Sequence, residues 1–290
     1  MRVLLTGGAG DLATVLSARL QARGDTPVRL DIIAPRNAGG VYIAGSLLDR
    51  AGVRRAMDAI DCVVHIAAWH GIHEATRQKD AYAFWELNVT GTFHVFEAAA
   101  RAGVRQVVYI SSTSIRDTTS LYGHSKVLGE EMAHTYATRH GMRIVVLRPR
   151  GFIPSWNTAV YPSSVEWAQW FWRGAVHIED VGQAVMQGID LTLTTALEKA
   201  LVLVVDGAYE YTTEDLATWD QCGPGSTFRR YYARYETLAR QHGLLPEVPP
   251  YMYDITETQR WLGYVPTYSL RNVLAELDAY GPAGPPHPYC

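Results

Sequence analysis

Cysteine is scarce in this chain, and its scarcity excludes two structural solutions. Among 290 residues only Cys62, Cys222 and Cys290 are cysteines, and none belongs to a CxxC pair or a Cys/His cluster. A disulfide framework or a structural zinc site therefore has no support. An excess of one charge is also lacking, since the formal net charge is −3 and the pI about 6.4. This balance argues against a nucleic acid or an anionic membrane surface as the partner.

Long hydrophobic runs are absent as well. No apolar run reaches the length of a membrane span, and the first residues, MRVLLTGGAG, enter a strand pattern without a signal-type apolar region. We therefore expect a cytoplasmic protein with no membrane partner. Apolar residues are nevertheless abundant, at 48% of the chain, which is enough for a substantial core.

Strand-like and helix-like patterns alternate along the first half of the chain. Strands are expected at 2–6, 27–32, 40–45, 62–68, 106–111 and 143–148, and helices at 11–24, 49–59, 80–102 and 121–140. Apolar strands that alternate with helices predict a parallel sheet covered on both faces. Residues 1–150 are thus expected to form a doubly wound α/β core, and 151–290 mainly a smaller lobe. Residues 176–207 are expected to return to the core as one helix and one strand.

A glycine turn joins the first expected strand to the first helix. In LLTGGAGDLATVL, Gly7 and Gly10 are three residues apart, and Ala13 follows three residues later. Such a turn lets backbone N–H groups approach a pyrophosphate, and the helix N-terminus favours anions. Ala13 suits close packing of the helix on the strand. An ordinary glycine turn is the alternative, but the position within a βαβ unit favours dinucleotide binding.

Asp31 closes the second expected strand, eighteen residues after Ala13. A carboxylate at this point can accept both hydroxyls of an adenosine ribose and repels a 2′-phosphate. The next residue is Ile32 rather than arginine, which favours NAD over NADP. Arg29 and Arg36 are close enough in sequence to leave NADP open, and a solvated aspartate at a strand end is the alternative.

The stretch YISSTSIRDTTSLYGHSK places Tyr122 and Lys126 four residues apart, with Tyr122 ten residues after Ser112. On a helix these two side chains share a face and can enter one cleft. A tyrosine with a pKa of about 10 is a poor base, but a lysine ammonium and a positive nicotinamide ring favour its phenolate. Ser112 is predicted to polarise the substrate oxygen, and Ser111 and Thr113 are neighbours that could line the site.

Together these segments resemble the extended short-chain dehydrogenase/reductases, the NAD-dependent epimerase/dehydratase family. The matching segments occur in the family's order: TGGAGDLA, VVHIAA (63–68), ELNVTGTFHVFEAA (86–99), YISS, YGHSK, VHIEDV (176–181) and YDITETQRWLGYVPTYSL (253–270). The resemblance implies that Lys126 also holds the nicotinamide ribose, that Asn88 helps to position the active-site helix and that Ala67 lies against the dinucleotide. It also implies a homodimer built on the helices at 80–102 and 121–140. Residues 1–150 are accordingly expected to be an NAD-binding, Rossmann-type core, and 151–290 mainly a small substrate-binding lobe. The remaining expected cofactor contacts are Gly7, Gly10, Asp11, Leu12, Asp31, Ser46, Leu47, Ala68, Ser111 and Tyr122.

Departures from the family pattern narrow the reaction. The run Ser111-Ser112-Thr113-Ser114 carries no carboxylate, whereas the dehydratases of the family carry an acid there, so dehydration is disfavoured. The segment from Pro149 to Val176 is short for a nucleotide-sugar site. Uronate dehydrogenases are a compact branch of the family with a similarly short segment, and WFWRGAVHIED resembles a run that they carry. This resemblance implies a sugar acid or related polyol as the substrate.

Several side chains are candidates for contact with such a substrate. Arg150 or Arg173 could bind a carboxylate bidentately, or could be plain surface charge. Trp69 and Thr113 are further candidates. Four tryptophans could form a sugar-stacking wall, or could belong to the core or a dimer contact: Trp156, Trp167, Trp170 and Trp172. The histidines His65, His70, His73 and His177 lack a ligand spacing, so no metal site is expected.

The leading hypothesis is an NAD-dependent oxidoreductase that acts on a small hydroxylated substrate such as a sugar, a sugar acid or a related alcohol. The first alternative is an NAD-dependent nucleotide-sugar epimerase. The second, from another class, is a non-catalytic dinucleotide sensor. The intact set of serine, tyrosine and lysine counts against the sensor, because a sensor needs no base.

Overall fold

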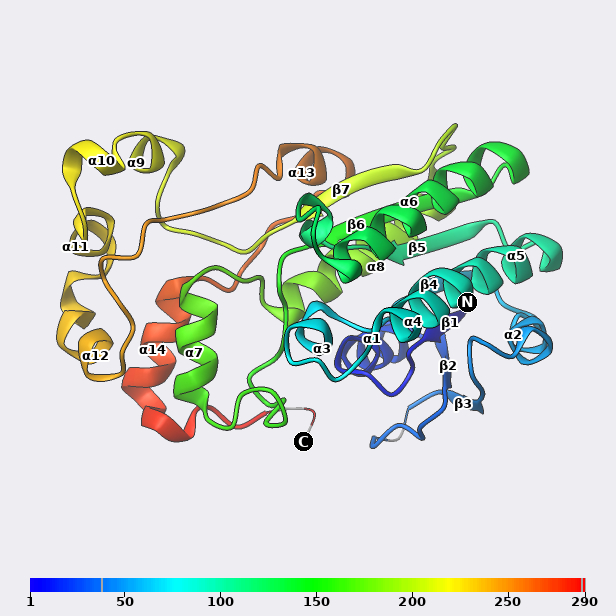
Figure 1. Ribbon diagram of the computed structural model, residues 1–290, viewed down its shortest axis with the longest axis horizontal. Helices are drawn as coiled ribbons and strands as arrows, with labels where there is room; N and C mark the ends of the chain where they lie inside the picture. The colour runs from blue at the N-terminus through cyan, green and yellow to red at the C-terminus, as the bar shows by residue number, and fades with distance from the viewer. Residues whose placement is uncertain (38, 288, 290) are drawn as a thin grey trace.

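One sheet with parallel neighbouring strands forms the centre of the molecule (Figure 1). The computed structural model describes residues 1–37, 39–287 and 289. The strand order is β3-β2-β1-β4-β5-β6-β7. The strands are β1 (Arg2–Thr6), β2 (Thr26–Asp31), β3 (Val41–Ala44), β4 (Cys62–His65), β5 (Gln106–Ile110), β6 (Arg143–Pro149) and β7 (Leu201–Val205). The expected Rossmann-type α/β fold is confirmed, and all of its carboxyl strand ends meet at one edge.

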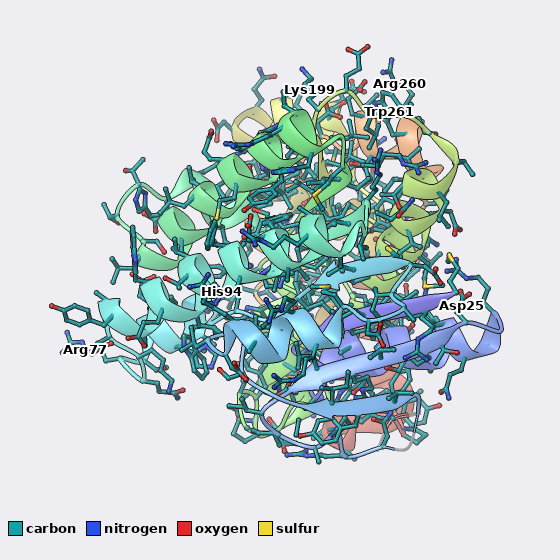
Figure 2. The ribbon with its side chains drawn as sticks, turned by 90° about the vertical axis from the view of Figure 1, so that its right-hand side faces the viewer. Asp25, Arg77, His94, Lys199, Arg260 and Trp261 are labelled. Atoms are coloured by element: carbon teal, nitrogen blue, oxygen red, sulfur yellow. The ribbon has the colours of Figure 1, made fainter. Side chains whose placement is uncertain are left out.

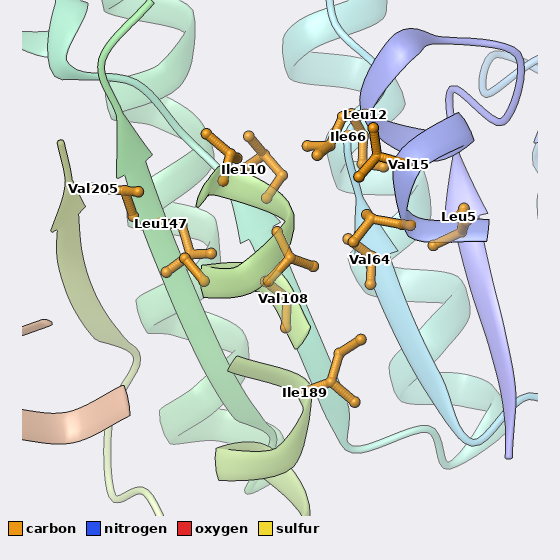
Figure 3. Close-up of a cluster of buried hydrophobic side chains, with 14 of the residues drawn as sticks. Leu5, Leu12, Val15, Val64, Ile66, Val108, Ile110, Leu147, Ile189 and Val205 are labelled. Atoms are coloured by element: carbon orange, nitrogen blue, oxygen red, sulfur yellow. The ribbon is translucent and has the colours of Figure 1, made fainter. Parts of the chain in front are cut away.

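Alternate side chains of the central strands point to opposite faces of the sheet. In β1, Val3 and Leu5 pack beneath α1 (Asp11–Ala22) and α8 (Ile178–Thr194), whereas Leu4 packs on the other face. Figure 3 shows the first of these faces, where strand side chains meet those of the two helices. Because both faces are covered, the strands are apolar along their whole length, which is the pattern that the sequence shows.

The second face of the sheet is covered by α2 (Arg50–Ala56), α5 (Thr92–Ala102) and α6 (Leu121–His140). Figure 1 shows α5 and α6 side by side. The helix expected over 80–102 consists of three parts, because α4 (Ala81–Phe84) and a π-helical turn, η1 (Trp85–Gly91), precede α5. A π-helical turn is rare and frequently marks a functional site. This turn carries Asn88.

The C-terminal lobe has an aromatic core of its own. It is built on α7 (Ser164–Trp172), α11 (Ser226–Tyr232), α12 (Glu236–Gln241) and α14 (Leu270–Tyr280), shown on the left of Figure 1. Trp167 and Trp172 are buried in that core, and Trp170 stacks on Tyr161. Trp156 packs at the edge of the sheet's core, against Tyr289. These contacts assign the tryptophans to packing.

The shorter elements of the lobe are connectors. They are α9 (Thr213–Ala217), α10 (Trp219–Cys222), and the 3₁₀ turns η3 (Ala233–Tyr235) and η4 (Gly281–Ala283). One further helix, α13 (Thr256–Leu262), packs on α8 and β7 rather than on the lobe. Residues 178–205 therefore rejoin the sheet between two stretches that belong to the lobe.

Several charged side chains project from the surface. Arg77, Lys199 and Arg260 project into solvent (Figure 2).

Cys62 is a buried free thiol and Cys222 an exposed one, while Cys290 lies outside the described residues. In the part of the chain that the structure describes, no helix is both long and apolar enough to cross a membrane.

Candidate active site

The glycine turn after β1 forms a tight cradle. Gly7 has a φ of +69°, and a Cβ there would lie 3.0 Å from the Cα of Ala67. The Gly10 N–H donates to the Gly7 carbonyl at 3.0 Å. The N-terminus of α1 follows without a side-chain cap, and the Asp11 carboxylate instead accepts a hydrogen bond from Asn157 at 2.8 Å. Uncapped helix amides beside a glycine turn fit the pyrophosphate of a dinucleotide.

Asp31 lies beside this cradle, at the end of β2. One of its carboxylate oxygens accepts the Ala9 N–H at 2.9 Å. Arg29 is buried, and its guanidinium donates to the Gly8 carbonyl (2.6 Å) and to the Asn37 side chain (2.9 Å). That guanidinium is therefore not free for a 2′-phosphate. The turn and Asp31 fit NAD, in which the ribose presents hydroxyls at this position.

Two of the expected cofactor contacts have side chains that face the core. Leu12 and Leu47 are both buried, so only their backbone groups can face a cofactor. The Leu47 carbonyl accepts a hydrogen bond from Nδ1 of His94 at 2.8 Å. Ser46 and Ala68 are half-buried and follow the carboxyl ends of β3 and β4. They lie on the sheet edge where such folds bind ligands.

The predicted serine, tyrosine and lysine meet at the same edge. Tyr122 lies in the first turn of α6 with 9% of its surface exposed, and the Ser112 side chain lies close to its hydroxyl. Ser112 begins the 3₁₀ turn η2 (Thr113–Arg116), which joins β5 to α6. Nζ of Lys126 donates to the Ile110 carbonyl at 2.7 Å and lies 5.8 Å from the centroid of the Tyr122 ring. The structure thus brings these three side chains together.

Burial shifts the pKa of both ionisable members of this set. It raises the pKa of Tyr122 to about 12, against which the hydrogen bond with Ser112 acts. It also lowers the pKa of Lys126 to about 7, although the nearby Glu130 carboxylate opposes that shift. An ammonium at Lys126 favours a phenolate at Tyr122. Because a neutral amine gives no such support, the set suits acid–base chemistry while Lys126 is charged.

Ser111 lies beside this set, but its hydroxyl turns toward α6. It donates to the Glu130 carboxylate at 2.5 Å, and that carboxylate also accepts from Nε of Arg148 at 2.8 Å. We did not predict Glu130 from the sequence. Its position, four residues after Lys126 on the same helix face, was the available signal.

Asn88 connects the active-site helix to the residues that follow β4. Its amide accepts the Trp69 N–H at 2.7 Å and donates to the Trp69 carbonyl at 2.9 Å. It also donates to the Ser125 hydroxyl at 3.0 Å. These contacts fit the positioning role that the family resemblance implies. Nζ of Lys79 lies over the ring of Trp69, 4.1 Å from the ring centroid.

Arg150 is occupied by contacts within the protein. It is buried at the end of β6, where it donates to Tyr209 (2.9 Å) and to the Tyr251 carbonyl (2.8 Å) and pairs with Asp206 (3.5 Å). These groups belong to β7 and the lobe, so the guanidinium fastens the lobe to the sheet. The structure therefore does not support the idea that Arg150 is free for a substrate carboxylate.

The other candidates for substrate contact are spread apart. Arg173 is exposed and lines a hollow within the lobe, together with Trp172 and Tyr251. That hollow contains no member of the Ser112–Tyr122–Lys126 set. Thr113 is half-buried and contacts the Pro149 carbonyl at 3.5 Å.

One histidine of the sheet, His65, is held by two side-chain hydrogen bonds. His65 bridges the hydroxyls of Thr6 (2.7 Å) and Thr92 (2.8 Å), and burial lowers its pKa to about 3. Over residues 1–37, 39–287 and 289, no cluster of three or more His, Cys, Asp or Glu side chains could hold a metal ion.

A parallel sheet in this order, a glycine cradle with a ribose-facing carboxylate, and a buried tyrosine beside lysine and serine define a dinucleotide-dependent α/β enzyme. Residues 3–153 match the model of the NAD dependent epimerase/dehydratase family. The chain belongs to this family. Membership confirms the resemblance stated above, the enzyme class and NAD as the family's cofactor.

Relatives include dehydrogenases and epimerases. The chain is 32% identical over 169 residues to a uronate dehydrogenase of Pseudomonas putida, a match that covers 51% of this chain and 59% of the relative. It is 27% identical over 237 residues to a uronate dehydrogenase of Pseudomonas syringae pv. tomato, covering 73% and 83%. A solved UDP-galactose 4-epimerase has a TM-score of 0.70 at 22% identity, covering 94% and 96%. That likeness shows the shared fold.

Proposed function

We propose that this chain is an NAD-dependent dehydrogenase that oxidises a small hydroxylated substrate, a sugar acid or a related sugar. The observation that carries the proposal is the buried Tyr122 side chain, which lies close to Ser112 and one helical turn from Lys126. NAD, when bound, supplies the acceptor for a hydride. The first backbone amides of α1, those of Asp11 and Leu12, and the Asp31 carboxylate would hold it.

In this proposal each of the three side chains has a separate task. Tyr122 takes the proton of the substrate hydroxyl as the carbon is oxidised. Lys126 favours the phenolate by its positive charge. Ser112 donates a hydrogen bond to the substrate oxygen and orients it toward Tyr122. The set thus provides one base, one group that tunes the base and one donor.

Ion pairs occupy several of the lobe's cations, which leaves fewer of them to bind a nucleotide sugar. A diphosphate requires cations to bind it. Arg150 is committed to Asp206, and three further arginines of the lobe also lie against carboxylates: Arg230, Arg240 and Arg271. A substrate with one carboxylate or none needs fewer cations than a diphosphate does. The relation to uronate dehydrogenases supports the same choice.

The second candidate is the nucleotide-sugar epimerase, which the likeness of fold to a UDP-galactose 4-epimerase favours. The two candidates differ in net chemistry. We would incubate the protein with NAD and, separately, glucuronate, galacturonate, L-arabinose and UDP-glucose, and follow NADH at 340 nm. NADH formed in proportion to a uronate or a free sugar supports the dehydrogenase. An isomerised UDP-sugar without net NADH would refute the dehydrogenase and support the epimerase. NAD binding without turnover of any substrate would support the non-catalytic sensor.

We propose further that the protein is a homodimer that acts in the cytoplasm. Tyr82, Trp85 and Phe93 lie on α4, η1 and α5 with exposed fractions of 80%, 55% and 43%. An exposed aromatic face of this kind fits a subunit contact. Two free thiols fit a reducing compartment. Light scattering should give twice the monomer mass, and Trp85→Glu should give the monomer; a monomeric parent protein would refute the dimer.

A further inference from the structure

The chain that follows β4 forms an arm, residues 69–75, which includes the short helix α3 (Gly71–Ala75). The arm packs on the first turn of α6. At its first residue, the Trp69 backbone is held by two hydrogen bonds to the Asn88 side chain, of 2.7 and 2.9 Å. Near its other end, Glu74 reaches the start of α6. The arm is thus fastened on both sides of the residues that lie over Tyr122.

Glu74 makes three hydrogen bonds to the first turn of α6. One carboxylate oxygen accepts the Leu121 N–H at 2.7 Å. The other accepts the Tyr122 N–H at 3.0 Å and the Ser120 hydroxyl at 2.8 Å. Burial opposes the charge on this carboxyl, but the bonds from Tyr122 and Leu121 outweigh it and hold the pKa of Glu74 below its usual range. A charged carboxylate therefore satisfies helix amides that otherwise lack a partner.

The arm also covers the ring of the proposed base. The imidazole of His70 lies nearly parallel to the Tyr122 ring, with centroids 6.3 Å apart and an interplanar angle of 19°. A Cβ added to Gly71 would lie 3.3 Å from Cδ1 of Tyr122. The groups that face the phenol are thus His70 from the arm, Ser112 from the end of β5, and Lys126 from α6. Displacement of the arm would admit water to the phenol.

We propose that Glu74 is a positioning residue for the reaction at Tyr122: it fixes the turn that carries the phenol and holds the arm across it. The inference rests on the proposed function, because it assigns Tyr122 as the base. A misplacement of about 1 Å can cost about a hundredfold in rate. Since burial is what raises the pKa of Tyr122, loss of the cover should lower it.

The test compares Glu74→Ala and Glu74→Gln with Asp80→Ala. Asp80 caps α4 by accepting the Ala83 N–H at 2.9 Å, so its loss removes a similar hydrogen bond away from the phenol. Hydrogen exchange of the unliganded protein should be unchanged in Asp80→Ala but should quicken in the peptide containing residues 119–126 of the Glu74→Ala variant. In that variant kcat should fall at least tenfold while KM for NAD stays within twofold. The acid limb of its rate profile should move to lower pH.

The glutamine variant keeps one acceptor oxygen, so its exchange rate and kcat should lie between those of the parent and Glu74→Ala. It also carries the test if the alanine variant does not fold. Faster exchange with unchanged kcat and an unchanged pH profile would overturn the inference, as would a loss of kcat without faster exchange. Absence of turnover by the parent protein would refute the proposed function, whereas an active parent and equally active Glu74 variants would refute only this inference.

Discussion

Replacement of Tyr122 by phenylalanine tests the proposed proton transfer most directly. The substitution removes one oxygen from a buried side chain and keeps the ring in its packing between His70 and Lys126. The Ser112 hydroxyl keeps the hydrogen bond that it accepts from the Ser114 N–H at 3.0 Å. The fold should tolerate this change, because the net contribution of one buried hydrogen bond is about 1 kcal/mol.

The loss of rate should be far larger than the loss of stability. A positioned general base typically contributes about 10²–10⁴-fold, which corresponds to about 3–5 kcal/mol of activation free energy. We therefore expect kcat for NADH formation to fall by at least a hundredfold in Tyr122→Phe. The dissociation constant for NAD, measured by calorimetry, should stay within about threefold. The residual rate should lose the acid limb that the phenol imposes.

Tyr136 provides the matched control on the same helix. Its hydroxyl donates to Glu97 at 2.7 Å, so Tyr136→Phe also deletes one hydrogen bond of a tyrosine on α6. It should show a similar change in melting temperature and normal turnover. If Tyr122→Phe retained kcat within threefold of the parent protein, the proton would have to go to another group, and the assignment of the base would be wrong.

Three further predictions concern buried ionisable side chains. Lys126→Met removes the cation beside the phenol, so kcat at pH 7 should fall at least tenfold and the acid limb of the oxidation profile should move to higher pH. Burial lowers the pKa of His65 to about 3, so below about pH 6.5 the unfolded chain binds a proton that the folded chain does not. Between pH 7 and 4 the parent protein should therefore lose about 3 kcal/mol more unfolding free energy than His65→Gln does in urea titrations. Arg150→Met leaves the buried Asp206 carboxylate unpaired and should cost about 3–5 kcal/mol of unfolding free energy, much of it restored by adding Asp206→Asn. A higher KM for uronates at unchanged stability would instead make Arg150 a substrate ligand.

Local patterns sufficed to predict the sheet and its helices. The strand at 2–6 and the helix at 121–140 have the bounds that the sequence predicts. Apolar periodicity places the interior of each element, and a glycine in a left-handed conformation, such as Gly141, ends the helix. Tyr122 and Lys126 could be paired for the same reason, since their spacing within one helix defines a shared face.

Contacts between distant segments could not be read in this way. Glu74 is separated from Tyr122 by 48 positions, and Arg150 from Tyr251 by 101. No periodicity connects such pairs, so the role of Glu74 was missed and Arg150 looked free. The hydroxyl of Ser111 was likewise expected at the cofactor, and only the folded arrangement shows it bonded to Glu130.

The same burial has opposite consequences for the two ionisable partners of the site, and this fixes what the surrounding residues must do. Exclusion of water raises the pKa of Tyr122 and lowers that of Lys126, so burial alone would leave a neutral phenol beside a neutral amine. The phenolate becomes accessible only if the ammonium stays close and the hydroxyl keeps its hydrogen bond to Ser112. Both conditions depend on the geometry of the first turns of α6, where Glu74 is bound. The same contacts therefore set both the exclusion of water from Tyr122 and the pKa of its hydroxyl. A change that loosens the arm should alter the pH profile as well as the rate.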